Sequence, residues 1–372
     1  MKKCLKLFVL CLALGASVAC HKTKVMPSGP ALVSHTRFML EEVGSFTIGN
    51  ASKSAKVEID FGDGTTKEGL CGDVFEHAYT VPGDYTIVAN IADGEEVSKR
   101  VRVYSLLSMS SLTPKLASAG NNQVLVMTHR AHSTDKSIPE NSIPAVQECI
   151  RLGVDIVEVD THRTADGQIV ICHDQTIDRT TNGSGDITKM NLADIKQYRL
   201  LDREGRVTNE TMPTLEELLK AARGKIYVNL DYSPRTASTA EVLAVVEKLD
   251  MVQCVLMYCN TEAKVKECLA IDKKVQCYPW ISAYGPLKGM GNYFVQLNDG
   301  GAVGTAENDG MLTTVNMASV VSGSQGDITG NAFVLNEAEV DGILGAYPHV
   351  KIIHTDTPEE LINYLDSKGL RQ

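Results

Sequence analysis

The sequence has no surplus of basic residues, no Gly-x-Ser-x-Gly motif and no Cys-x-x-Cys pair. Its 36 Lys and Arg residues are outnumbered by 46 Asp and Glu residues, which gives a net charge of −10. This balance excludes a nucleic-acid partner, because non-specific binding to nucleic acid needs a basic surface. The missing serine motif excludes the nucleophile elbow of an α/β-hydrolase. An anionic substrate is still compatible with the acidic charge, since a bound cation can reverse the local field.

Cysteine is present, but its spacing is not that of a metal or disulfide framework. Three of the 10 cysteines lie in the first 20 residues, and most of the other seven lie in apolar runs. Because no Cys-x-x-Cys pair occurs, neither a zinc site nor a disulfide framework is expected. We predict that these seven thiols are buried and behave as small hydrophobic side chains.

The N-terminus has the pattern of an export signal. Three lysines precede an apolar run over residues 7–19 that is too short to cross a bilayer as a helix. The run ends in Ser17-Val18-Ala19-Cys20, which resembles a bacterial lipoprotein signal with a lipidated cysteine; ordinary signal-peptidase cleavage is the alternative. We expect a signal peptide at residues 1–19, a lipid anchor on Cys20 and a polar tether at residues 20–30. The protein would then be attached to a membrane of the cell envelope, facing the periplasm or the cell surface.

Residues 31–104 show short alternating segments separated by turn residues, which predicts a small immunoglobulin-like β-sandwich. Three ordered motifs occur there: Asp60-Phe61-Gly62-Asp63-Gly64, His77-Ala78-Tyr79 and Pro82-Gly83-Asp84-Tyr85. With these motifs the segment resembles a PKD domain, which implies a spacer or a module that contacts glycan or protein. We expect Asp60, Asp63 and His77 to be turn and packing residues, not a metal site.

After a predicted linker at residues 105–122, apolar strands alternate with amphipathic helices. Eight strands are expected, at residues 124–127, 156–159, 227–230, 254–258, 275–278, 293–297, 332–335 and 351–353. This pattern favours an α/β fold, with a TIM (β/α)8 barrel over residues 123–372. Asn141 is a candidate N-cap, Gly153 a helix stop, and Thr214 to Glu217 a capping box. Residues 300–330 are expected to hold a long loop and one helix.

Polar side chains gather where the predicted strands end. Glu158 and Asp160 are two residues apart on one strand, so they share a face, and Asp231 ends the next strand. Catalytic residues of such barrels lie at these strand ends, and three carboxylates suit a hard cation such as Mg²⁺ or Ca²⁺. With histidines for proton transfer and an arginine for phosphate oxygens, the set favours phosphate ester chemistry. Each residue alone also has a structural interpretation, such as an ion pair between Glu158 and a lysine.

The order of motifs from residue 123 onward resembles the glycerophosphodiester phosphodiesterase family. The matching residues include His129-Arg130, Pro139-Glu140-Asn141-Ser142, His173-Asp174, Arg179-Thr180-Thr181-Asn182-Gly183 and Thr355-Asp356-Thr357-Pro358. The resemblance implies metal-dependent hydrolysis of a glycerophosphodiester or a related head-group diester. The products would be a phosphomonoester such as glycerol 3-phosphate and an alcohol; related barrels use a substrate hydroxyl and release a cyclic phosphate.

The resemblance also implies roles at individual positions. His129 and His173 would form the acid–base pair, and Glu158, Asp160 and Asp231 would bind the metal. The remaining predicted contacts are with substrate, from Arg130, Asn141 and Ser233. The family usually has a phosphate-binding lysine at the position of Ser233, which supplies a hydrogen bond without charge. This difference motivates a second hypothesis, a surface-anchored binding protein on a catalytically weakened barrel.

Overall fold

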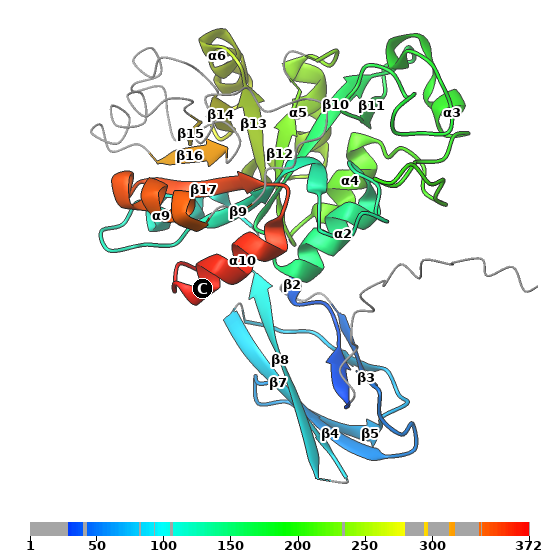
Figure 1. Ribbon diagram of the computed structural model, residues 1–372, viewed down its shortest axis with the longest axis vertical. Coiled ribbons are helices and arrows are strands. Elements are labelled where there is room, and N and C mark those ends of the chain that lie inside the picture. Colours follow the sequence, from blue (N-terminus) through cyan, green and yellow to red (C-terminus); the bar gives the residue numbers. More distant parts are fainter. Residues whose placement is uncertain are drawn as a thin grey trace, which may run out of the picture.

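The structure is a computed structural model, and it has two parts, which Figure 1 shows stacked along the long axis of the molecule. It describes residues 29–39, 43–81, 83–92, 94–104, 107–232, 235–279, 294–296, 312–316, 335 and 337–371. The predicted signal peptide at residues 1–19, Cys20 and Ser233 lie outside these residues. Among the described residues, no helix has the length and apolar character needed to span a bilayer.

The N-terminal part consists of two small sheets that share one apolar core. The three-stranded sheet has the order β1 (Ala31–Val33), β3 (Gly44–Gly49), β6 (Phe75–His77). The five-stranded sheet has the order β2 (Arg37–Met39), β8 (Glu95–Tyr104), β7 (Gly83–Ile91), β4 (Lys56–Asp60), β5 (Thr66–Leu70). Phe46 from the first sheet and Ile59 and Ile87 from the second are fully buried in this core. Alternate residues of β3 and β4 point inward, as their period-two pattern predicts.

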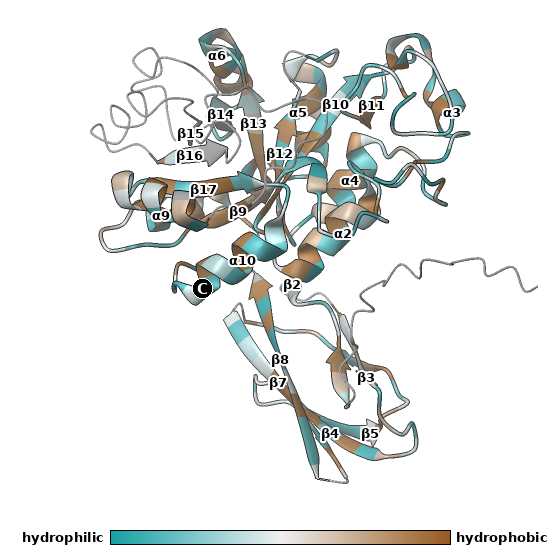
Figure 2. Ribbon diagram, viewed as in Figure 1, coloured by the Kyte–Doolittle hydropathy of each residue, from teal (hydrophilic) through white to brown (hydrophobic). Residues whose placement is uncertain are grey.

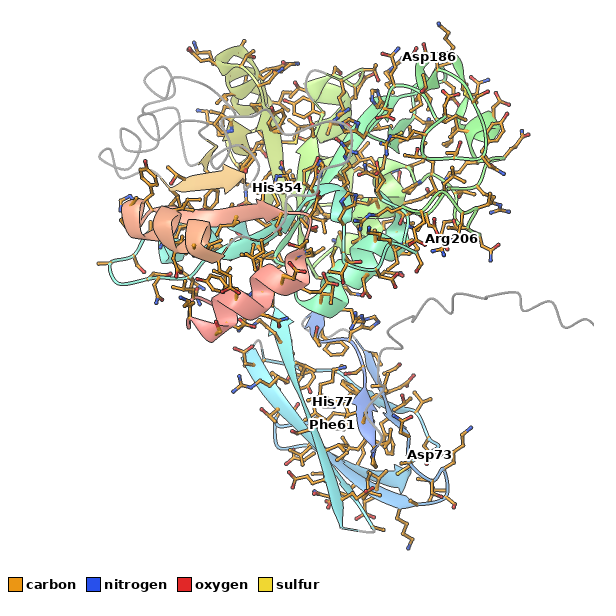
Figure 3. All side chains as sticks on the ribbon, viewed as in Figure 1. Phe61, Asp73, His77, Asp186, Arg206 and His354 are labelled. Atoms are coloured by element: carbon orange, nitrogen blue, oxygen red, sulfur yellow. The ribbon has the colours of Figure 1, made fainter. Side chains whose placement is uncertain are left out.

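The polar residues of this part stabilise turns, as predicted. Asp60 Oδ1 accepts the Gly62 N–H at 2.8 Å, and Asp63 Oδ2 lies 2.7 Å from His77 Nε2. The imidazole of His77 stacks on Phe61 with 4.2 Å between ring centroids, and Figure 3 shows the two side chains together between the sheets. Gly62 has a φ of +80°, and a Cβ there would lie 2.6 Å from the Thr86 carbonyl oxygen, so this turn requires glycine.

The C-terminal part is an α/β domain built on a curled parallel sheet. Its strands are β9 (Leu125–Thr128), β10 (Ile156–Arg163), β12 (Tyr227–Asp231), β13 (Val255–Cys259), β14 (Gln276–Pro279), β15 (Val295–Gln296), β16 (Thr313–Asn316) and β17 (Val350–Thr355). Each pairs with its neighbour in sequence from β9 to β14 and from β15 to β17, and β17 also pairs with β9. This cyclic order is that of a (β/α)8 barrel, although no ladder joins β14 to β15 in the described residues.

Helices surround this sheet and bury its outer face. They are α2 (Ile143–Leu152), α4 (Leu215–Ala222), α5 (Thr239–Lys248), α6 (Glu262–Ile271), α9 (Glu337–Ala346) and α10 (Pro358–Ser367), whereas the short α3 (Leu192–Ile195) packs in a separate small cluster with residues of β11. Figure 2 shows apolar residues concentrated along β9 and β12, inside this helical layer. The predicted capping box at Thr214 and Glu217 is confirmed, and Gly153 ends α2 with a φ of +84°.

Two predicted elements differ from the structure. Ser142, not Asn141, caps α2, because its hydroxyl accepts the Ala145 N–H. Strand β16 lies in the stretch predicted to hold a loop and a helix. Of the strand predicted at residues 332–335, residues 332–334 lie outside the described residues, and residue 335 is not in a strand. Consecutive β-branched residues (Thr313, Thr314 and Val315) account for β16.

The predicted linker contains a helix that belongs to the α/β domain. Helix α1 (Met109–Leu116) follows β8, and Met109 and Leu116 are buried in the core of the parallel sheet domain. The Cys254 thiol also donates to the Leu107 carbonyl oxygen, at the short helix η3 (Val252–Cys254). The Ser, Pro and Gly content of residues 105–122 suggested a linker, but three well-spaced apolar side chains fix this segment in place.

Candidate active site

The candidate site lies where β9, β10 and β12 end. In the parallel ladder, Asp160 on β10 is directly opposite Asp231, the last residue of β12. Glu158 precedes Asp160 by two residues and therefore points to the same side of the strand. One oxygen from each carboxylate can be chosen so that all three lie within 4.8 Å of one another. The strand register thus brings together the three predicted metal ligands.

These carboxylates repel one another in a buried setting. Glu158 and Asp160 are buried, and burial together with the charges of Asp160 and Asp231 raises the pKa of Glu158 well above its usual value. Burial likewise raises the pKa of Asp231 to about 6. Burial would also raise the pKa of Asp160, but the Arg235 guanidinium holds it below its usual value. A positive charge is needed to keep all three groups ionised.

A hard divalent cation fits this group of residues. Oδ1 of Asp231 is buried and has no hydrogen-bond partner in the described part of the chain. The donor atoms are carboxylate oxygens, which Mg²⁺ and Ca²⁺ prefer, and they are already close enough to share one ion. The cost of burying three acidic groups is then offset by the ion.

Arg130 is held by an unusual turn after β9. It lies in the short helix η1 (His129–Ala131) with a φ of +50°, outside the region that most residues adopt. This turn directs its backbone N–H to Glu158 Oε2, at 2.8 Å. Its guanidinium lies 3.4 Å from Glu140 and 3.8 Å from Asp160. Arg130 therefore both positions one predicted ligand and places a positive charge beside another.

Asn141 contacts Asp160 through both ends of its amide. Its Nδ2 donates to Asp160 Oδ2 at 2.8 Å, and its Oδ1 accepts the Asp160 backbone N–H at 3.2 Å. The residue has a φ of +53°, and its own N–H donates to the Arg130 carbonyl oxygen. Predicted as a substrate contact and a helix cap, Asn141 is found to orient a carboxylate.

His129 belongs to a cluster of three histidines and one carboxylate. Oδ1 of Asp356 lies 3.0 Å from His129 Nδ1 and 2.8 Å from His132 Nδ1. The His354 ring, labelled in Figure 3, is 5.5 Å from the His129 ring. Burial lowers the pKa of His129, although hydrogen bonding to Asp356 opposes this, and burial lowers the pKa of His354 to about 3. His129 is thus favoured in its neutral form.

His173 reaches the same site from β11 (Ile169–Ile171), which runs antiparallel to β10. Its Nδ1 is 2.6 Å from Asp174, and Arg179 donates to the same carboxylate. The adjacent Cys172 N–H donates to the Asp160 carbonyl oxygen at 2.9 Å, which fixes the chain beside β10. His173 also contributes to the electrostatic lowering of the pKa of Asp160. Each of the two predicted acid–base histidines therefore has a carboxylate at Nδ1.

Arg235 is the residue that the sequence analysis missed. Its Nη2 donates to Asp231 Oδ2 at 3.0 Å and also to Asp160, and its Nη1 donates to the His173 carbonyl oxygen. It follows Asp231 by four residues, close to the position where the family's lysine was expected. Its nearness to that position could have identified Arg235 as a site residue from the sequence. In the same way, the Thr355-Asp356-Thr357-Pro358 motif could have identified Asp356.

The described residues thus bring together His129, Arg130, Asn141, Glu158, Asp160, His173 and Asp231. Ser233 and Cys20 lie outside the described residues.

Comparison with known proteins agrees with this geometry. Residues 129–281 match the model of the Glycerophosphoryl diester phosphodiesterase family. A glycerophosphodiester phosphodiesterase of Caldanaerobacter subterraneus subsp. tengcongensis is 38% identical over 111 residues, which are 29% of this chain and 45% of that protein. One of Bacillus subtilis is 34% identical over 131 residues, covering 31% and 43%. The chain thus spans less than half the length of these curated relatives.

The fold is similar to that of a solved structure. A crystal structure of a glycerophosphoryl diester phosphodiesterase from Parabacteroides distasonis superposes with a TM-score of 0.58 at 21% identity. The match covers 71% of this chain and 93% of that one. The family match over residues 129–281 and this similarity of fold agree with the meeting of the predicted site residues at the parallel strands.

Proposed function

We propose that the protein hydrolyses a glycerophosphodiester, or a related head-group diester, to a phosphomonoester such as glycerol 3-phosphate and an alcohol. The observation that carries the proposal is the meeting of Glu158, Asp160 and Asp231 at neighbouring strand ends, beside His129 and His173. This stretch lies within the part of the chain that matches the phosphodiesterase family.

Proton transfer would be the task of the two histidines. Asp356 next to Nδ1 of His129, and Asp174 next to Nδ1 of His173, favour the tautomer with a proton on Nδ1. Nε2 of each ring is then the atom that accepts or donates a proton. One histidine would take the proton of the attacking hydroxyl, and the other would protonate the leaving alkoxide.

Charge stabilisation would be shared between arginines and a cation. Glu158, Asp160 and Asp231 would hold a divalent cation, Mg²⁺ or Ca²⁺, which supplies positive charge next to the phosphoryl oxygens when bound. Arg235 would provide the cationic contact that the family's lysine provides elsewhere, because its guanidinium already lies beside Asp160 and Asp231. Arg130 would add a second positive charge from the turn after β9.

The remaining predictions concern the setting of this domain. We propose a closed TIM (β/α)8 barrel, preceded by a PKD-like, immunoglobulin-like sandwich that serves as spacer or contacts glycan or protein. An export signal with lipidation at Cys20 would attach the protein to an envelope membrane. Retention of the protein in the membrane fraction of cells, and its release after Cys20→Ser, would test the anchor.

The central experiment is an assay of the full chain against glycerophosphocholine, glycerophosphoinositol and other diesters, with Mg²⁺, with Ca²⁺ and with a chelator. We expect cation-dependent release of glycerol 3-phosphate, lost in His129→Ala and in Glu158→Ala. His35→Ala, at an exposed position of the N-terminal part, is the matched control and should keep full activity. Full activity of His129→Ala would overturn the site assignment.

One observation favours a second candidate function, a binding protein on a catalytically weakened barrel. Arg235 pairs with two of the three carboxylates and would compete with a cation for them. If the full panel of diesters is not hydrolysed, yet glycerophosphodiesters still bind in calorimetry, the binding function is the correct one.

A further inference from the structure

The thiols of three cysteines lie close together where helix α6 packs on strands β13 and β14. Cys259 ends β13, Cys277 lies on β14, and Cys268 lies on α6, which packs over both strands. Cys277 is paired with Met257 in the ladder, two residues before Cys259, so both strand thiols leave the same face of the sheet. All three residues are fully buried.

The three sulfur atoms are close enough to share one ion. They all lie within 4.8 Å of one another, and Sγ of Cys259 is 3.9 Å from Sγ of Cys268. Thiolate bonds to a zinc ion are about 2.3 Å long, so three sulfurs around one trigonal ion would be separated by about 4.0 Å. The observed spacing therefore needs little adjustment.

Polar side chains lie beside the sulfur of Cys268. The buried hydroxyl of Tyr232 lies 3.3 Å from Sγ of Cys268 and also contacts the Thr239 hydroxyl. Lys264 donates to the Thr239 hydroxyl at 3.2 Å and places a positive charge near the three thiols.

We propose that Cys259, Cys268 and Cys277 bind one soft, thiophilic d¹⁰ cation, of the class represented by Cu(I) and Zn(II). Sulfur ligands without carboxylate or imidazole select such ions over Mg²⁺ or Ca²⁺. On binding, S–H bonds break, sulfur–metal bonds form and the protons pass to water, with no change in oxidation state. This site is independent of the proposed phosphodiesterase activity and separate from its carboxylates.

The predicted effect is structural. An ion at this point would cross-link α6, β13 and β14, and Tyr232 would connect it to the end of β12, where Asp231 lies. Because the ion binds only the folded chain, it raises the temperature of unfolding.

The test uses the full chain, which is first reduced with a reductant that is not a thiol and so does not compete for the ion. The protein is then loaded with Cu(I) or Zn(II) and desalted. We expect wild type to retain a single ion per chain, and Cys268→Ser and Cys268→Ala to bind it more than about tenfold more weakly. Cys149→Ser, which changes a buried thiol of α2, is the matched control and should bind as wild type does. The ion should also raise Tm in wild type and in Cys149→Ser, but not in either Cys268 variant.

The two probe ions identify the preferred geometry. Retention of Cu(I) alone indicates a three-coordinate ion, whereas retention of Zn(II) that is weakened by Tyr232→Phe indicates a fourth, phenolic ligand. A variant with Glu158→Gln and Asp160→Asn excludes the carboxylate site as the source and should retain the soft ion.

Three results would overturn the proposal. The first is equal retention by wild type and both Cys268 variants, with circular dichroism showing that all are folded. The second is loss of the ion in the carboxylate variant. The third is a Cys259–Cys268 disulfide in the protein before reduction, found by peptide mass spectrometry, which would make the cluster a redox pair.

Discussion

Arg235 Nη2 donates a hydrogen bond to Asp231 Oδ2 at 3.0 Å, and the same guanidinium contacts Asp160 on the neighbouring strand. One arginine therefore balances two of the three carboxylates that we assign to a cation. Its charge can serve the carboxylates or a phosphate group, and an ion bound to the carboxylates would favour the second arrangement.

Replacing Arg235 should separate these two roles. Arg235→Gln removes a competitor for the carboxylates, so we expect tighter Mg²⁺ or Ca²⁺ binding by calorimetry. It also removes a cation from the phosphate, so kcat/KM should fall by about 10²–10³. Arg235→Lys keeps the charge and should recover part of the activity. Unchanged kcat/KM in Arg235→Gln would show that this arginine does not contact substrate.

Asp356→Asn should impair His129 without removing it. The carboxylate accepts from Nδ1 of His129 and stabilises the protonated ring, so its loss should lower the pKa of His129 further. We expect kcat to fall by about 10²–10⁴, as for a lost general base. The limb of the pH–rate profile that rises with pH should shift to lower pH, because a base with a lower pKa is deprotonated earlier. A profile identical to that of wild type would exclude this role.

Asn141 offers a test of how a carboxylate is oriented. Asn141→Ala loses both hydrogen bonds to Asp160 and also strains the backbone at a φ of +53°. Asn141→Gly loses the same hydrogen bonds but relieves the strain. Both should weaken cation binding by about 10–100-fold, whereas only the alanine variant should carry the added cost in stability. Comparable cation affinity in wild type and Asn141→Gly would contradict the assignment.

Glu158→Gln should stabilise the protein while removing its response to cations. In the presence of a chelator, burial and the charges of Asp160 and Asp231 act against Glu158. The amide removes that repulsion and should raise the free energy of unfolding by about 1–2 kcal/mol. Added Mg²⁺ or Ca²⁺ should raise Tm of wild type but not of the variant. If the variant is less stable than wild type in chelator, the charge of Glu158 is not repelled by Asp160 and Asp231 as we infer.

Glu140 should give the protein a distinct sensitivity to acid. Burial alone would raise the pKa of Glu140, but the neighbouring His132 ring and the hydrogen-bonded guanidinium of Arg179 hold it well below the usual value. A carboxyl whose pKa is lowered by folding stabilises the protein above about pH 4.3, its unfolded value, and this stability is lost as the pH falls toward the folded value.

The matched variant is Glu140→Gln, studied by urea unfolding between neutral and acidic pH. At neutral pH it should be less stable by about 1–3 kcal/mol, because the largely buried Arg130 and the half-exposed Arg179 lose their charged partner. Its stability should then decline less than that of wild type as the pH falls below about 4.3. Parallel curves for the two proteins would show that Glu140 does not control the acid response.

The carboxylate pattern was predictable because strand geometry alone determines it. Residues two apart on a strand share a face, and the ends of parallel strands meet at one edge, so Glu158, Asp160 and Asp231 could be brought together from their positions. The arginine at 235 was not predictable in the same way, since its side chain reaches the site from a loop. Residue spacing does not determine where a long, flexible side chain of a loop ends.

The thiol cluster shows a second limit of sequence patterns. Cys259, Cys268 and Cys277 follow one another at equal intervals of nine residues, on a strand, a helix and the next strand. A Cys-x-x-Cys spacing is typical of metal ligands that lie on one turn of the chain. It does not occur where strand pairing and helix packing bring distant cysteines together. The burial of all seven described cysteines was predicted correctly, but the convergence of three of them was not.

Helix α1 has a consequence for how the protein can be divided. Because Leu107, Met109 and Leu116 are buried in the α/β core, a recombinant fragment that begins at residue 123 would expose the core residues that they cover. Such a fragment is expected to aggregate, whereas one that begins at residue 105 keeps this cover. The useful boundary for separating the two parts in recombinant fragments therefore lies directly after β8.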